Sequence, residues 1–168
     1  MKALTTITLL IVTITIISGC GDASRPKDLP KLYPCTVTIT QEGKPLADAM
    51  IEFVPADAAN AKFRAVSMTG KDGSVKMATY GFTGAPAGKY KVVVTKTMND
   101  DIVYAAEVNP SSGEKDIVSY NTYRMVDEQY SSAETTPFEI EITGKERSVT
   151  KTFDAGKAVK VKTGGSGK

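Results

Sequence analysis

The segment from Gly84 to Thr95 most constrains what this chain can fold into. It opens with a run of glycine, alanine and proline and continues as the most regular alternating stretch of the sequence. The apolar side chains of Tyr90, Val92 and Val94 fall on one face of an extended strand, and those of Lys89, Lys91 and Thr95 fall on the other. A strand with one apolar face must bury that face against a second layer, so the segment predicts a layered β-protein.

Six further short runs alternate in the same way, and glycine, proline, asparagine or aspartate separate them. They are Cys35–Thr40, Ala49–Val54, Ala65–Thr69, Ser74–Thr79, Pro137–Ile142 and Ser148–Phe153. No segment has the apolar period of a helix over several turns. The sequence therefore predicts an all-β, antiparallel β-sandwich of about seven strands over residues 33–161, with an edge strand near 158–161 and a disordered tail over 162–168.

The turn at Gly70-Lys71-Asp72-Gly73 predicts a β-hairpin between the two runs that flank it. A calcium-binding loop is the alternative interpretation. Such a loop needs oxygen ligands at several alternating positions, and Asp72 stands nearly alone here. We expect a turn and no metal site.

The first nineteen residues have the pattern of a secretory signal peptide. One positive charge at Lys2 precedes about fifteen uncharged residues, fewer than a membrane-spanning helix needs. The segment ends in Ile17-Ser18-Gly19-Cys20, which resembles the lipobox of bacterial lipoproteins. The resemblance implies that Cys20 is acylated, that residues 1–19 are removed, and that the membrane is a partner. A retained anchor helix or a buried strand is the alternative.

Residues 20–32 contain two prolines and no periodicity, so we expect a tether between the lipid and the domain. Gly21 is not acidic, and the resemblance to lipoproteins therefore favours the outer over the inner membrane of a cell envelope. Cys35 lies on the apolar side of its strand and is expected to be a small buried side chain. A Cys20–Cys35 disulfide in a protein without lipid is the alternative.

Residues 98–136 are expected to form a long, irregular interruption of the sandwich. Long loops often carry function, and this one holds tyrosine side chains that offer contact area at low entropic cost. The candidate binding surface for an envelope protein or a glycan consists of Tyr104, Tyr120, Tyr123 and Tyr130. Alternatively, these rings cover the open end of the sandwich.

Three segments together resemble carboxypeptidase regulatory-like domains. They are the opening Gln41–Phe53, the hairpin Thr69–Val75 and the strand Ala87–Val94. The step Tyr130–Phe138 is similar to one found in lipoprotein members. The resemblance implies a transthyretin-like (prealbumin-type) Greek-key sandwich that serves as a non-catalytic accessory or binding domain, a fold that does not by itself fix a function.

Composition narrows the classes of function. The chain has no histidine, the commonest general acid-base residue and metal ligand. Hydroxyisourate hydrolases and intradiol dioxygenases, which use histidine on related sandwiches, are therefore disfavoured. A carboxylate pair that cleaves glycosides stays open. The net charge of +2 is spread along the chain and does not indicate a nucleic-acid partner. We expect no enzyme activity and no cofactor.

Overall fold

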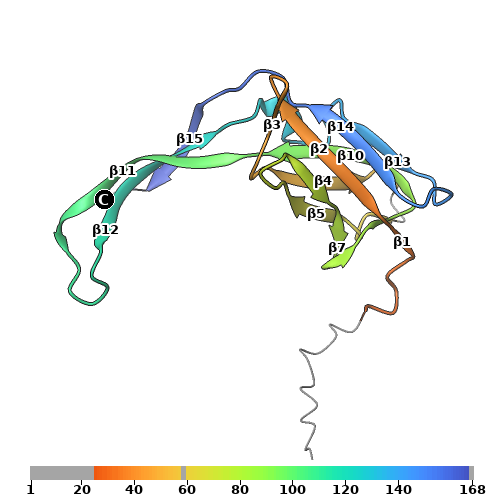
Figure 1. Ribbon diagram of the computed structural model, residues 1–168, viewed down its shortest axis with the longest axis horizontal. Helices are drawn as coiled ribbons and strands as arrows, with labels where there is room; N and C mark the ends of the chain where they lie inside the picture. Colours follow the sequence, from red (N-terminus) through yellow and green to blue (C-terminus); the bar gives the residue numbers. More distant parts are fainter. Residues whose placement is uncertain (1–24, 58–59, 167–168) are drawn as a thin grey trace, which may run out of the picture.

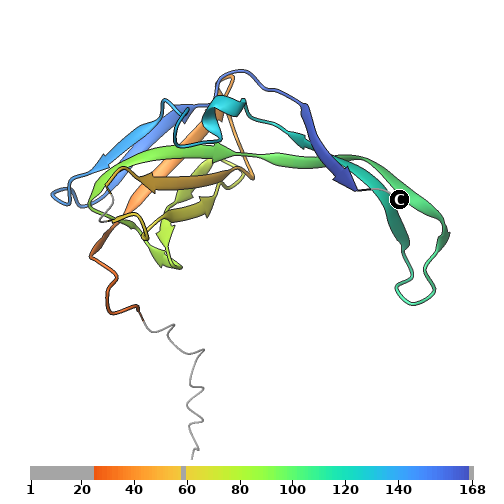
Figure 2. The same ribbon diagram turned by 180° about the vertical axis from the view of Figure 1, so that it is seen from behind.

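The computed structural model describes residues 25–57 and 60–166. Two β-sheets face each other as a sandwich, and a third sheet projects from one end of it as an arm (Figures 1 and 2). The predicted all-β sandwich is therefore confirmed. Within the described ranges there is no helix with the length and apolar character needed to cross a membrane.

The two sheets of the sandwich contain seven strands of three or more residues, as expected. The first sheet has the order β13-β10-β4-β5-β7-β8. Its strands are β4 (Met50–Pro55), β5 (Ala65–Met68), β7 (Ala78–Thr79), β8 (Phe82–Thr83), β10 (Gly88–Thr95) and β13 (Glu139–Ile142). In the second sheet β2 (Cys35–Gln41) pairs with β3 (Lys44–Pro45), β6 (Ser74–Lys76) and β14 (Val149–Asp154). A two-stranded sheet joins β1 (Leu32–Tyr33) to β9 (Ala85–Pro86).

Strand β10 lies between β4 and β13 and supplies the centre of the core. Tyr90, Val92 and Val94 are fully buried, as their alternation predicted. The Tyr90 ring lies 5.5 Å from the ring of Phe53 on β4, and its hydroxyl donates a hydrogen bond of 2.8 Å to the Pro86 carbonyl. The aromatic ring thus fills the core while its one polar atom keeps a partner.

Cys35 begins β2 and is buried, as expected for a small apolar side chain. Burial raises the pKa of its thiol to about 11. The reactive thiolate form is therefore suppressed at neutral pH.

Two details of strand pairing differ from the sequence prediction. Strands β2 and β14 run parallel, so the sandwich is not purely antiparallel. The turn before Gly73 does form, with Asp72 accepting hydrogen bonds from the backbone and side chain of Ser74. However, β5 pairs with β4 while β6 pairs with β2, so the chain crosses between the sheets instead of forming a hairpin.

The sequence predicted a long loop over residues 98–136 and a disordered tail over residues 162–168. Both predictions are wrong, because the structure forms strands over most of these residues. Residues 98–136 contain β11 (Thr97–Val108), β12 (Lys115–Arg124) and a short 3₁₀ turn, η2 (Glu128–Tyr130). Strand β15 (Val161–Ser166) replaces the expected tail and pairs with β12. The sheet β11-β12-β15 is the arm.

Candidate functional site

The arm is a direct continuation of the sandwich, because only Lys96 separates β10 from β11. Its base is fixed by three hydrogen bonds. Lys96 accepts one of 2.9 Å from Met125 N and donates one of 2.8 Å through Nζ to the Ala47 carbonyl. Gln41 at the end of β2 donates one of 3.1 Å to the Met125 carbonyl. At about 3.3 Å per residue, the twelve residues of β11 then span about 40 Å.

A polar cluster joins the three strands of the arm next to this base. Asp101 on β11 accepts hydrogen bonds from Tyr123 Oη and, at 3.0 Å, from Asn121 Nδ2 on β12. Asp100 forms an ion pair of 2.5 Å with Lys160, whose ammonium lies 4.5 Å from the centre of the Tyr123 ring. We call these five residues the brace, because they tie β11, β12 and the segment before β15 together.

The brace shifts the pKa of its members in the directions that favour its own contacts. The hydrogen bonds from Asn121 and Tyr123 lower the pKa of Asp101, and the one from Lys160 lowers that of Asp100. The same contacts raise the pKa of Tyr123 and of Lys160. A depressed carboxyl pKa adds stability that is fully present above 3.8 and is lost as the pH falls through the folded pKa. A raised tyrosine pKa adds stability that is fully present below 10 and is lost as the pH rises through the folded pKa. The brace therefore persists across the neutral range.

We expect Asp101→Asn to lower the pKa of Tyr123 towards its usual value of 10, because the hydroxyl then faces a neutral acceptor. Asparagine tolerates the positive φ of 53° at this position, so the backbone is retained. A ¹³C NMR titration of labelled tyrosine ring carbons measures the shift. Glu107→Gln, the same chemical change farther along β11, should leave Tyr123 unaltered. Equal effects of both variants would contradict the brace.

Beyond the brace, the described part of the arm narrows to β11 and β12, because residues 161–166 of β15 pair with Tyr120–Arg124 and not farther out. We call residues 102–119 the distal ribbon. The ladder between β11 and β12 is irregular from Asp100 onward, so its side chains do not sort into one apolar and one polar face. Its exposed large apolar side chains are Ile102, Val103, Tyr104, Val108, Ile117 and Val118.

A two-stranded ribbon that leaves so many apolar side chains in water is marginal by itself. Three carboxylates and one lysine add a net negative charge: Glu107, Glu114, Asp116 and Lys115. At the tip, Asn109 Nδ2 donates to the Asp116 carboxylate at 3.1 and 3.2 Å and closes the turn. The distal ribbon thus presents an apolar, acidic surface that projects from the body.

The four predicted tyrosines do not share one surface. Tyr104 is exposed on the distal ribbon, whereas Tyr120 and Tyr123 are half-buried on β12. Tyr120 and Tyr123 are three positions apart along β12, and this odd spacing places them on opposite faces. Tyr130 belongs to the core, because η2 turns its ring inward to stack 4.8 Å from Phe138. The alternative role of covering the sandwich end thus applies to Tyr130.

The aliphatic residues of the distal ribbon were missed by the sequence reasoning. The available signal was the pair of β-branched dipeptides Ile102-Val103 and Ile117-Val118 on either side of the Asn109–Gly113 turn. Cys20, the predicted lipid-attachment residue, lies outside the described residues.

The N-terminal segment and the arm lie at opposite ends of the sandwich (Figure 1). Strand β2 follows the N-terminal segment at Cys35 and ends at Gln41, which hydrogen-bonds to the arm base.

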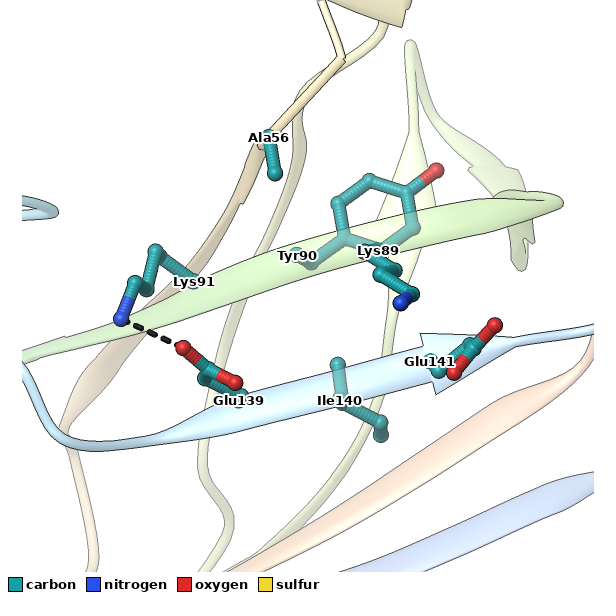
Figure 3. Close-up of a pocket in the computed structure, with 7 residues that line it drawn as sticks. All are labelled: Ala56, Lys89, Tyr90, Lys91, Glu139, Ile140 and Glu141. Carbon is teal, nitrogen blue, oxygen red and sulfur yellow. Dashed lines mark hydrogen bonds and ion pairs between the residues drawn. The ribbon is translucent and has the colours of Figure 1, made fainter.

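A hollow of about 290 Å³ lies between β10 and β13 on the sandwich (Figure 3). Lys91 and Glu139, which face each other in register, form an ion pair of 2.6 Å at its rim, and Lys89 opposes Glu141 in the same way along the ladder. The hydrogen bond from Lys91 lowers the pKa of Glu139. Glycoside cleavage needs a carboxyl group whose pKa is raised, so this arrangement fits a solvated cross-strand ion pair better than a catalytic acid.

No family model and no curated protein matches the sequence. Among solved structures, the chain is similar to the crystal structure of a 9R-lipoxygenase from Cyanothece PCC8801, at 14% identity and a TM-score of 0.34. The alignment covers 78% of this chain and 18% of the lipoxygenase. Among the described residues no group of three or more histidine, cysteine, aspartate or glutamate side chains could hold a metal ion.

Proposed function

We propose that this protein is a lipid-anchored, non-catalytic accessory domain of a bacterial cell envelope, and that its arm is a docking element for protein. The observation that carries the proposal is the distal ribbon, a projecting two-stranded surface with six exposed large apolar side chains. Exposed apolar surface of this extent typically marks an interaction site. In this proposal Cys20 carries the lipid, the outer membrane is favoured, and the body is a carboxypeptidase regulatory-like, transthyretin-like sandwich.

Four features support the proposal beyond the exposure itself. The lipobox-like segment supplies an anchor, and the arm leaves the sandwich at the end opposite the N-terminal segment. The brace and the base contacts hold the arm in one direction, which reduces the entropic cost of docking. The absence of histidine from the sequence supports a non-catalytic role over a hydrolase.

A glycan-binding tyrosine surface is less well supported than a protein-docking arm. Tyr130 is buried, and the hydroxyl of Tyr123 is already engaged by Asp101. Only Tyr104 presents an exposed ring on the distal ribbon. The exposed surface of the ribbon is mainly aliphatic, which suits a protein partner better than a sugar.

Site-specific photo-crosslinking in intact envelopes tests the proposal. A benzophenone side chain at Tyr104 or Val118 should give crosslinks to protein when the cells are irradiated. The same probe at Thr150, an exposed position on β14, is the matched control and should give none. Equal crosslinking from arm and control positions, or no protein crosslink from the arm, would overturn the docking role.

A further inference from the structure

A second exposed apolar surface lies on the body, along β5. Val66 and Met68 on β5 are exposed, together with Met50, the register partner of Met68 on β4, and Tyr80. We call these four residues the β5 patch. A shallow hollow of about 440 Å³ at the same place is lined by Lys62, Arg64, Val66, Ala78, Tyr80 and Gly81.

The backbone edge beside the β5 patch is open. Strand β5 pairs with β4 over all four of its residues, but it pairs with β7 only at Ala65. No other described strand pairs with Val66–Met68 on that side. An open edge with exposed apolar side chains is a template for the addition of another strand.

The distal ribbon has the matching properties. Strand β11 is the outer strand of the arm, so one of its edges is open as well. The ribbon is apolar and acidic, whereas both charged side chains that line the hollow, Lys62 and Arg64, are cationic. Lys62 pairs with Asp28 and Arg64 with Glu52, but each cation is still more than half exposed, and a guanidinium has five donors to share.

The arm does not lie against the β5 patch of its own chain, because it extends away from the body (Figure 1). The arm and strands β5 and β7 instead border the same concave side of the molecule (Figures 1 and 2). The arm of the first copy can therefore contact the β5 patch of the second copy, while the arm of the second copy contacts the β5 patch of the first. Such a reciprocal contact obeys two-fold symmetry and closes after two copies.

We propose that two copies of this chain exchange arms: the distal ribbon of each adds through β11 to the open Val66–Met68 edge of the other. This inference rests on the proposed docking role of the arm and names the partner as a second copy. One chain supplies both the acidic, apolar ribbon and an apolar patch bordered by two partly exposed cations, Lys62 and Arg64. Anchoring in one membrane would also raise the effective concentration of the two copies for each other.

The test uses full-length protein in its native envelope and two differently tagged copies expressed together. The tags are inserted between Glu146 and Arg147, in an exposed loop away from the arm. The benzophenone probe at Tyr104 is placed in the first copy only. Irradiation should give a species of twice the monomer mass that carries both tags.

Two variants then separate arm exchange from other forms of self-association. Val66→Glu/Met68→Glu in the second copy should reduce the doubly tagged species about tenfold, because the probed arm loses its patch. The same pair of changes in the first copy should leave the amount of the doubly tagged species unchanged, because the patch of the second copy is intact. Both positions are exposed, so the fold tolerates the changes, and a melting curve of each variant checks this.

Three results would overturn the inference. A doubly tagged species that survives the patch variant in the second copy would indicate arm-to-arm packing. A crosslink only to a different protein would exclude the second copy as the partner and leave the docking role standing. No crosslink to any protein would remove both the exchange and the docking role.

Discussion

Replacing Cys20 by serine is expected to move the protein from an almost wholly sedimenting membrane fraction to an almost wholly soluble one. A serine hydroxyl does not replace the thiol as the acyl acceptor in the proposed lipoprotein pathway. Each buried methylene contributes about 0.8 kcal/mol to membrane binding, so losing two or more acyl chains removes the anchor entirely. Ultracentrifugation of carbonate-washed membranes, followed by immunoblotting, measures the partition. No membrane-crossing helix is found among residues 25–57 and 60–166 to hold the protein in its place.

The matched control is the other cysteine. Cys35→Ala removes a thiol that is buried at the start of β2, so it should leave the protein in the membrane fraction. Mass spectrometry of the wild-type N-terminal peptide should show fatty acid on Cys20. A Cys20→Ser protein that still sediments after the carbonate wash would refute the lipid anchor and the proposed location in the cell envelope.

Truncating Tyr90 to alanine is expected to lower the free energy of unfolding by about 3–5 kcal/mol, a large share of the stability of a domain this size. The ring is 1% exposed and packs beside Phe53, so its removal leaves a cavity between the two sheets. Its hydrogen bond to the Pro86 carbonyl is lost as well. Urea denaturation followed by circular dichroism, on protein carrying Cys20→Ser, gives the change.

Two companion variants divide this effect into its parts. Tyr90→Phe keeps the ring and removes only the hydroxyl, so it should cost about 1–2 kcal/mol. Lys91→Ala changes the next residue of the strand, whose partly exposed side chain forms the ion pair with Glu139, and should cost less than about 1 kcal/mol. If Tyr90→Ala cost no more than Lys91→Ala, the assignment of β10 as the central core strand would be wrong.

The sandwich could be predicted from the sequence because a strand with one buried face has apolar residues at every second position. Tyr90, Val92 and Val94 recur at every second position because one face of β10 meets the core, and Ile51 and Phe53 do so on β4 for the same reason. The pattern says which side chains point inward and does not say which strand lies beside which. The parallel pairing of β14 with β2 and the separation of β5 from β6 were therefore out of reach.

The arm was missed because it has no core to impose such a pattern. Water reaches both faces of the distal ribbon, and irregular pairing after Asp100 breaks the period of two. Strand β15 contains Gly164 and Gly165, and glycine is disfavoured in strands. It forms because β12 supplies a partner: a Cβ at Gly165 would lie 2.6 Å from the Tyr120 carbonyl oxygen, so only glycine allows this approach.

The single residue between β10 and β11 has a mechanical consequence. A pull on the arm is delivered along the axis of β10, whose backbone hydrogen bonds to β4 and β13 lie across that axis. Those bonds are then loaded in shear, and many must fail together before the strand slides out. In the proposed lipid-anchored arrangement, the sandwich would therefore carry tension between the membrane and the partner that the arm binds.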